Sequence, residues 1–326
     1  MKMRRLIYSV LALAAMAFTF PSCNDDAPEE VQMTFTASLA QNANSRALSE
    51  GELINKVKCE VYEGNTKRTE AIVDFKDGSA SYTPTLLKGR TYQVVFWAYK
   101  DGAYNVSDLT QITRAQNVLF CNNEDLDAFT AIKDNVNTEV TGTNLTVTLS
   151  RPLAQLRIGT TTQDISDAKS LLANKDLKKS MITIDKAYTK YNALTKTSSE
   201  QQSVTFCKAD LIANETFTIG EGANQITYNL IGMTYLFADN SSETSTCNLT
   251  VYAGEGEDEE AVHGKDGEGN ENSLEYTNVP IKPNTRTNII GQLLTGNVPY
   301  TISLSTGFTG TENNSGLNGN FPVPNE

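Results

Sequence analysis

Short segments in which apolar and polar residues alternate recur along the chain from Glu30 onward. In VQMTFTASL, residues 31–39, the side chains at odd positions are apolar and most of those between them are polar. The pattern returns in three further segments, KVKCEVY (56–62), RTYQVVFWAYK (90–100) and NLTVTLSRPLAQLRIG (144–159). A period of two residues is typical of strands with one buried face, and a long series of such strands predicts an all-β protein.

The spacing of these strands predicts two β-sandwich domains in tandem. One sandwich uses roughly 100 residues, whereas the strand-like segments extend over residues 31–308. A proline removes a hydrogen bond from a central strand, so Pro152 marks a break between two strands. We therefore expect an N-terminal domain over residues 31–150 and a C-terminal domain over residues 151–308.

Three segments depart from the strand pattern. Residues 164–172 form a helix candidate, with Asp164 or Ser166 available as the N-cap. Residues 254–275 are acidic and rich in glycine, which predicts a solvated hairpin insertion. Residues 309–326 are rich in Gly, Asn and Ser, which predicts a flexible tail.

The first 22 residues have the pattern of an export signal. Lys2, Arg4 and Arg5 precede the apolar stretch from Leu6 to Phe20. This stretch is shorter than the ~20 residues that a membrane-spanning helix needs. We therefore predict that residues 1–22 are a signal peptide.

A small residue before a cysteine ends this segment, as in bacterial lipoprotein signals. Ser22 and Cys23 fit that pattern, so we predict that Cys23 carries an acyl chain such as palmitate; ordinary cleavage is the alternative. Residues 23–30 then form an acidic tether. Asn24, Asp25 and Asp26 resemble the tag of Bacteroidales lipoproteins that reach the outer face of the outer membrane.

The charge of the chain excludes one class of partner. The sequence has 27 basic and 39 acidic residues, and loss of the signal removes three basic residues, which leaves 24 − 39 = −15. Nucleic-acid binding depends on Lys and Arg contacts to phosphates, so we expect no nucleic-acid partner.

No residue pattern points to catalysis or to a cofactor. His263 is the only histidine and lies in the acidic insertion, which argues against a Ser-His-Asp triad and excludes HExxH chemistry. Cysteines 59, 121, 207 and 247 have no CxxC spacing, so neither a zinc site nor a redox dithiol is predicted. Paired carboxylates of a glycan-active enzyme remain an alternative that no particular pair supports. We predict a non-enzymatic protein without metal or cofactor.

The two aromatic residues that invite a binding role have simpler interpretations. Trp97 lies in a strand with apolar residues on both faces, so we expect a core side chain and not a sugar-stacking platform. Tyr104, in KDGAYNVSD, is the one visible candidate for a loop aromatic that contacts a ligand, and we favour a turn tyrosine as its interpretation.

Several stretches in order resemble the fimbrillin superfamily of Bacteroidales, which contains pilins and related lipoproteins. They are NSRALSE (44–50), LLKGRTYQVVFWAY (86–99), SRPLAQLRIG (150–159), ITYNLIGMTYLFA (226–238) and VPIKPNTRTNIIGQLLTG (279–296). The resemblance implies two tandem transthyretin-like β-sandwich domains and export as a lipoprotein. It also implies a surface protein that is a structural or adhesive subunit of a pilus.

In the pilin members of this family, a protease cuts after an arginine downstream of the first strand. A strand of another subunit then fills the groove that the lost strand leaves. By this resemblance the cut would fall between Arg46 and Ala47, and it would release Cys23 and the strand Val31–Leu39 together. The expected partners are other pilin subunits or further copies of the chain, and an anchor, tip or accessory position is equally open.

Two alternatives remain at this point. Arg46 is an ordinary loop arginine if the protein keeps its lipid anchor permanently. Separately, the chain is read as a surface lipoprotein that stays monomeric and binds glycan or host protein through its loops.

Overall fold

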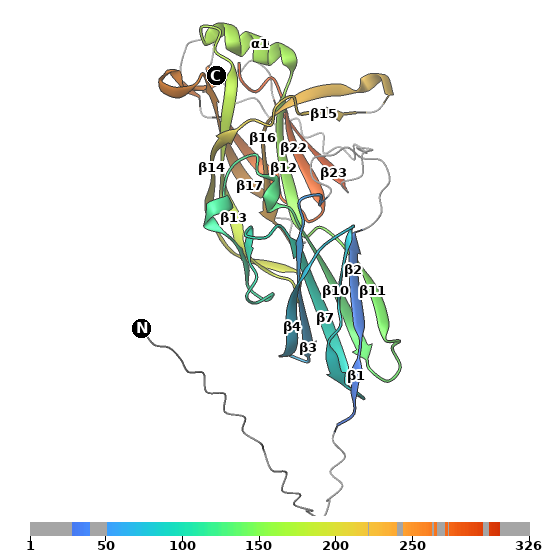
Figure 1. Cartoon of the computed structure of the whole chain (residues 1–326). Coiled ribbons are helices and arrows are strands. Elements are labelled where there is room, and N and C mark those ends of the chain that lie inside the picture. The colour runs from blue at the N-terminus through green and yellow to red at the C-terminus, as the bar shows by residue number, and fades with distance from the viewer. Residues whose placement is uncertain are drawn as a thin grey trace, which may run out of the picture.

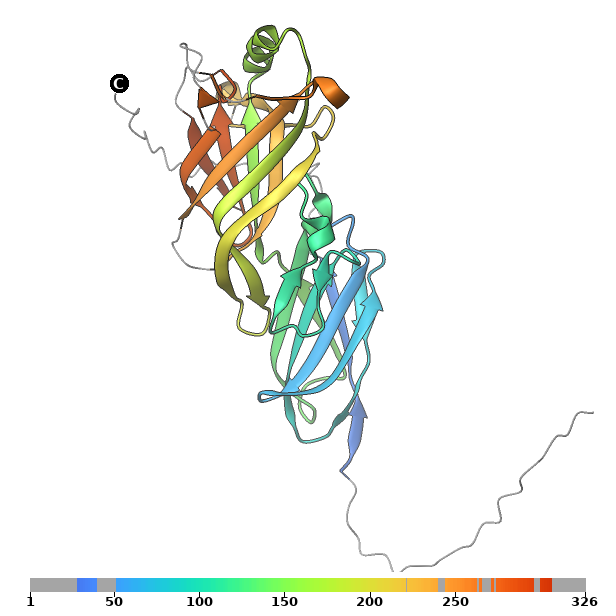
Figure 2. The same cartoon turned by 90° about the vertical axis from the view of Figure 1, so that its left-hand side faces the viewer.

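A computed structural model describes residues 28–39, 51–220, 222–239, 244–262, 264–265, 271–272, 274–295 and 300–306. The fold is all-β, as predicted, and consists of two sandwich bodies stacked end to end (Figures 1 and 2). The N-terminal body contains the strands β1–β7, β10 and β11, and the chain enters the C-terminal body for good at β12. Pro152 lies between β11 and β12, as the sequence predicted.

The N-terminal body has two facing sheets. The larger has the order β10-β7-β3-β4 and the smaller has the order β11-β2-β5, extended by the pair β1-β6. Its strands are β1 (Glu30–Gln32), β2 (Thr34–Leu39), β3 (Lys56–Glu63), β4 (Thr66–Asp74), β5 (Ser79–Tyr82), β6 (Thr85–Leu87), β7 (Thr91–Tyr99), β10 (Ala128–Asn137) and β11 (Asn144–Leu149). Fully buried side chains between the sheets include Met33, Phe35, Val57, Cys59 and Val94.

The C-terminal body is built on a longer set of strands. β13 pairs with β14, β17 and β9, and the path β16-β12-β22-β23 forms the opposite layer. Its strands are β12 (Leu153–Thr160), β13 (Leu177–Asn192), β14 (Thr197–Asp210), β15 (Thr216–Ile219), β16 (Ile226–Phe237), β17 (Thr244–Ala253), β18 (Glu260–Val262), β21 (Leu274–Pro280), β22 (Thr285–Gly291) and β23 (Thr301–Thr306).

The helix α1 (Thr162–Leu171) lies at the end of the C-terminal body farthest from β1 (Figure 1). It begins two residues before the predicted start. Thr161 is the N-cap, because its Oγ1 accepts a hydrogen bond from the Asp164 amide. Asp164, one of the two predicted caps, is instead a buried residue of the first turn.

A crossover segment, residues 103–127, leaves the N-terminal body and packs on the core of the C-terminal body. It contains β8 (Tyr104–Asn105), β9 (Ile112–Arg114) and the 3-10 turns η1 (Gln116–Val118) and η2 (Glu124–Leu126). β9 pairs with β13, so a segment from the first half of the sequence joins a sheet of the second half. The two bodies are therefore connected by a sheet as well as by the chain.

The acidic insertion is described only in part. It contains η4 (Gly256–Asp258), β18, and the antiparallel pair β19 (Gly264–Lys265) and β20 (Glu271–Asn272). A further 3-10 turn, η3 (Gly222–Asn224), precedes β16. His263 and the predicted tail 309–326 lie outside the described residues.

Candidate functional site

The predicted site residues Cys23, Arg46 and Ala47 lie outside the described residues. The strand between them, predicted to be displaceable, is described as β1 and β2. The Leu39 Cδ1 atom lies 3.0 Å from the position that a Cβ atom would take on Gly51. The two described residues that flank the segment carrying Arg46, Leu39 and Gly51, therefore lie next to each other.

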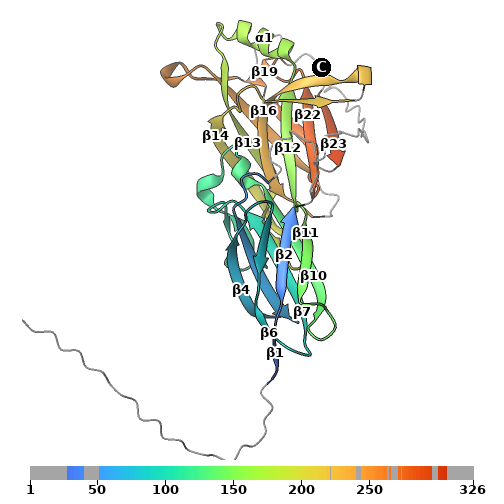
Figure 3. The same ribbon diagram turned by 45° about the vertical axis from the view of Figure 1, so that its right-hand side comes forward.

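β2 is the central strand of the smaller sheet of the N-terminal body (Figure 3). Phe35 is opposite Leu145 on the parallel neighbour β11 and opposite Tyr82 on the antiparallel neighbour β5. Met33, Phe35 and Ala37 have no exposed surface, which confirms the predicted inward face. Loss of this strand would leave two strand edges with unpaired backbone groups on either side of an open core.

The outward face of β2 is held by weaker contacts. Thr34 and Thr36 each share one hydroxyl–hydroxyl hydrogen bond, of 3.0 Å with Thr83 and 2.9 Å with Ser81. No side chain of this strand takes part in a buried ion pair among the described residues. The strand is therefore held by apolar burial and backbone pairing and not by polar anchors.

The start of the displaceable strand is held by a surface ion pair. The Lys88 ammonium lies 2.9 and 2.8 Å from the two carboxylate oxygens of Glu29, and the Lys88 amide donates to the Glu29 carbonyl at 2.7 Å. The hydrogen bond to Glu29 raises the pKa of Lys88. Both side chains are exposed, so this ion pair contributes little to stability.

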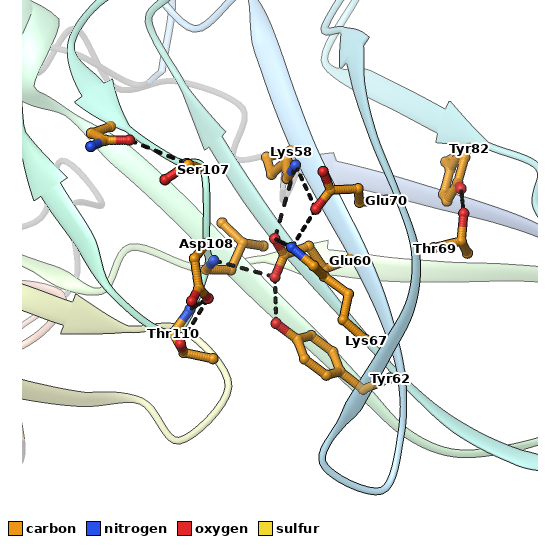
Figure 4. A network of polar contacts seen from close by, with 12 residues as sticks. Lys58, Glu60, Tyr62, Lys67, Thr69, Glu70, Tyr82, Ser107, Asp108 and Thr110 are labelled. Atoms are coloured by element: carbon orange, nitrogen blue, oxygen red, sulfur yellow. Dashed lines mark hydrogen bonds and ion pairs between the residues drawn. The ribbon is translucent and has the colours of Figure 1, made fainter.

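A buried polar network lies where β3 meets the crossover segment (Figure 4). The Glu60 carboxylate has no exposed surface; it accepts hydrogen bonds from the Tyr62 hydroxyl, from the Lys67 ammonium at 3.1 Å and from the Leu109 amide at 3.2 Å. Lys58 is 4% exposed and lies 3.9 Å from Glu60. Burial, together with the bond to Glu60, raises the pKa of the Tyr62 hydroxyl.

Leu109 connects this network to the C-terminal body. Its amide donates to Glu60, and its carbonyl accepts from the Ala193 amide at 2.8 Å, at the end of the β13–β14 hairpin. The sequence did not predict this site, because the alternating pattern of residues 56–62 places Lys58 and Glu60 on the polar face of a strand, which is usually exposed to solvent. The available signal was a pair of opposite charges two residues apart, which the pleat places on one face.

A second buried ion pair links the end of the crossover segment, at Asp127, to the connection between the bodies, at Arg151. Arg151 binds Asp127 through two nitrogens, with Nε–Oδ1 at 2.6 Å and Nη2–Oδ2 at 2.7 Å, and neither side chain is more than 3% exposed. The Arg151 guanidinium also lies 4.5 Å from the ring of Phe129. A bidentate pair of this kind fixes the orientation of the Arg151 guanidinium relative to the Asp127 carboxylate.

The aromatic and cysteine candidates are core residues. Trp97 is fully buried, as predicted. Tyr104 is 6% exposed and donates its hydroxyl to the Leu126 carbonyl, so it does not serve as a loop aromatic for ligand capture. All four described cysteines are free thiols, and three of them are buried. Burial raises the pKa of Cys121 to about 11, which disfavours the reactive thiolate.

Together these features define a two-body β-sandwich protein whose first strand is an inner strand and whose bodies are joined by a crossover segment. Residues 24–321 match the model of a family of unknown function, DUF6562, and the chain belongs to that family. No curated protein matches the chain at a significant level. Among the described residues, no helix combines the length and apolar character needed to cross a membrane.

Three solved structures are among those to which the chain is similar. A candidate cell adhesion protein from Bacteroides eggerthii is 12% identical, covering 87% of this chain and 98% of its own, with a TM-score of 0.45. A fimbrial assembly protein from Parabacteroides distasonis is 10% identical, covering 85% and 96%, with a TM-score of 0.40. A candidate polysaccharide-binding protein from Bacteroides thetaiotaomicron is 10% identical, covering 83% and 95%, with a TM-score of 0.44. At such scores these similarities assign no function to the chain.

Proposed function

We propose that this protein is a lipoprotein of the outer membrane surface that acts as a structural or adhesive subunit of a pilus assembled by strand exchange. Cys23 carries the lipid, the strand Val31–Leu39 is displaceable, and Arg46–Ala47 is the processing site. The proposal covers a stalk, anchor, tip or accessory position, and processing would release the subunit from the membrane into the fimbrium. We assign it no catalytic role.

The central position of β2 carries this proposal. A strand at a sheet edge can leave without opening the core, whereas removal of a central strand exposes the edges of β11 and β5 and the core between them. Full burial of one large apolar side chain stabilises by ~1.5–3 kcal/mol. Met33 and Phe35 are both fully buried, so the vacant groove would be costly until another strand filled it. Main-chain pairing and alternate side chains are what β-augmentation uses.

The position of Arg46 is consistent with processing. It lies in the sequence between Leu39 and Gly51, two residues that are close together on the N-terminal body, and its polar neighbours in the sequence suit a protease site. A cut there would separate the strand from the body without breaking any described element.

An Arg-specific protease tests the proposal on the purified full-length precursor. We expect cleavage between Arg46 and Ala47, mapped by mass spectrometry, followed by SDS-resistant ladders. Arg46→Ala is the matched control and should abolish both, while cuts at the exposed Arg68 and Arg90 would be unaffected. A precursor that is cut at Arg46 but stays monomeric and keeps its first strand would refute strand exchange.

The lipid anchor is tested separately. Metabolic labelling with a fatty-acid analogue should label the wild-type protein and not Cys23→Ala. Equal labelling of both would contradict attachment at Cys23 and leave the strand-exchange test unaffected.

A further inference from the structure

The arginines of the described residues divide sharply by exposure. Arg114, Arg151, Arg157 and Arg286 are at most 7% exposed and lie inside the two bodies. The side chains of the other two described arginines, Arg68 and Arg90, are 50% and 59% exposed. Both of them line the same pocket, on a chain whose net charge is −12.

This pocket lies at the seam between the two sheets of the N-terminal body. It has a volume of about 290 Å³ and opens between β4 of the larger sheet and β6 of the smaller one. Tyr92 is 3% exposed, and its hydroxyl accepts a hydrogen bond from the Leu87 amide at 3.1 Å. Tyr92 therefore gives the pocket a fixed aromatic wall.

The charges in the pocket are arranged asymmetrically. Glu63 holds Arg68 through Nε at 2.9 Å and Nη2 at 2.8 Å, so that guanidinium is already engaged and oriented. Arg90 reaches Glu63 only at 3.6 Å through Nη1, and this is its one ion pair within the described part of the chain. Arg90 therefore keeps N–H donors that a hydrogen-bond acceptor on a ligand can use.

The other residues that line the pocket, together with its volume, restrict the chemical class of ligand that fits it. A guanidinium fork matches a carboxylate through two parallel hydrogen bonds. Glu30, Glu63 and Thr85 bring oxygen acceptors to the lining that ligand hydroxyl groups can use, whereas a lipid or an aromatic hydrocarbon offers no donor to them. The volume of about 290 Å³ lies just below the usual range of ligand pockets, roughly 300–1,000 Å³, which suits a single sugar ring better than a larger ligand.

We propose that this pocket binds the carboxylate-bearing sugar of an acidic saccharide, with a uronic acid as the simplest form. Arg90 receives the carboxylate, and Glu63 and Thr85 bind ring hydroxyls. Glu30 belongs to β1, so the first strand completes the site while it is in place. The inference does not depend on cleavage at Arg46 or on strand exchange.

Titration calorimetry of the uncut mature chain tests this site with three probes: glucuronate, glucose and inorganic sulfate. We expect glucuronate to bind at least ~10-fold more tightly than glucose, since a charge-assisted pair is lost with glucose. Arg90→Ala should weaken glucuronate binding by ~10-fold or more, because it removes the carboxylate partner and leaves the Arg68–Glu63 pair intact.

Lys88→Ala is the matched control. Lys88 is an exposed cation two residues from Arg90 that does not line the pocket, so its loss should leave glucuronate binding unchanged. An equal loss of glucuronate affinity in Arg90→Ala and Lys88→Ala would show a general charge effect and overturn the site. The proposal is also overturned if glucose or sulfate binds as tightly as glucuronate. A third contrary result is the absence of glucuronate binding at about 20 mM, a concentration well above a millimolar Kd. None of these outcomes bears on strand exchange.

Discussion

The first strands of the two bodies occupy the same place in their sheets but are held in different ways. β2 lies between the parallel strand β11 and the antiparallel strand β5, and β12 lies between the parallel strand β22 and the antiparallel strand β16. All eight residues of β12 are buried, whereas β2 buries one face and leaves the other half-exposed.

Buried polar side chains tie β12 to its neighbours. Gln155 donates to the Tyr235 hydroxyl at 2.8 Å and accepts from Arg286 Nε at 2.8 Å. Arg157 donates from Nε to Asn288 at 2.8 Å. The strand Val31–Leu39 has no such anchors on its buried face, where Met33, Phe35 and Ala37 are fully buried. The two strands therefore have the same neighbours in their sheets, but β12 is also held by buried polar contacts (the locked strand), whereas β2 is held by apolar burial and backbone pairing alone (the separable strand).

The largest expected difference between the bodies is in thiol reactivity after cleavage. Cys59 lies in the core beneath β2, and Cys247 lies in the core of the C-terminal body. Burial raises the pKa of both, so neither should react in the uncut protein. Once the first strand is released, Cys59 should become labelled by a thiol reagent and Cys247 should stay protected.

This labelling is followed by peptide mass spectrometry on Cys23→Ala, which removes the predicted lipid-attachment cysteine and leaves the four described cysteines. Exposed Cys207 provides an internal positive control. Labelling of Cys247 together with Cys59 would mean that both bodies open, which contradicts a separable strand in only one of them.

The next largest effect is expected for the main core side chain of β2. Phe35→Ala should destabilise the N-terminal body by ~3–5 kcal/mol, because it removes a fully buried ring and leaves a cavity. Thr36→Ala, on the outward face of the same strand, should change stability by no more than ~0.5 kcal/mol. Urea denaturation followed by circular dichroism measures both, and equal effects would show that β2 is not held by its inward face.

A smaller loss is expected when the polar anchor of β12 is removed. Gln155→Leu deletes the acceptor of Arg286 and the donor to Tyr235, which should cost ~1–3 kcal/mol. Thr34→Val is the corresponding change on β2 and should cost ~0.5 kcal/mol or less, because its hydroxyl pair is exposed. If Gln155→Leu leaves the free energy of unfolding unchanged, the polar contacts of β12 do not hold that strand more firmly than β2 is held.

The smallest effect is expected at the surface pair of Lys88 and Glu29. The pKa of Lys88 is raised in the folded state, so the pair's contribution is fully present below the unfolded pKa of ~10.4 and is lost as pH rises through the folded pKa. Lys88→Ala should therefore slightly speed strand release after cleavage at pH 8 in low salt. The difference from wild type should vanish in 1 M salt, where charges are screened over ~3 Å. A difference that persists in high salt would point to a role of Lys88 other than its charge.

Local sequence patterns predicted part of this molecule well. The inward set of residues 31–39 followed from the pleat alone, because successive side chains of a strand point to opposite faces. The burial of Trp97 followed from the apolar residues on both sides of its strand. The helix start was misplaced by two residues, since Thr161 and Asp164 both suit a cap and only the backbone conformation distinguishes them.

Other features arise from contacts between distant segments. The crossover segment covers the outer face of β3, so Lys58 and Glu60 are buried although their strand looks half-exposed in sequence. The same segment buries Tyr104, which sequence reasoning treated as a turn or loop residue. The position of such a segment depends on long-range strand pairing, here between β9 and β13, which no local period encodes.

The sequence by itself determined the all-β architecture, the inward face of the first strand and the lack of a catalytic pattern, because these depend on side-chain period and residue type. The predicted lipid and processing sites also come from sequence, at Cys23 and Arg46. Only the tertiary structure decided that the first strand is an inner strand without polar anchors. It also brought Arg68 and Arg90 into one pocket with Glu63. Both results depend on sheet order, which is set by packing between segments far apart in the chain.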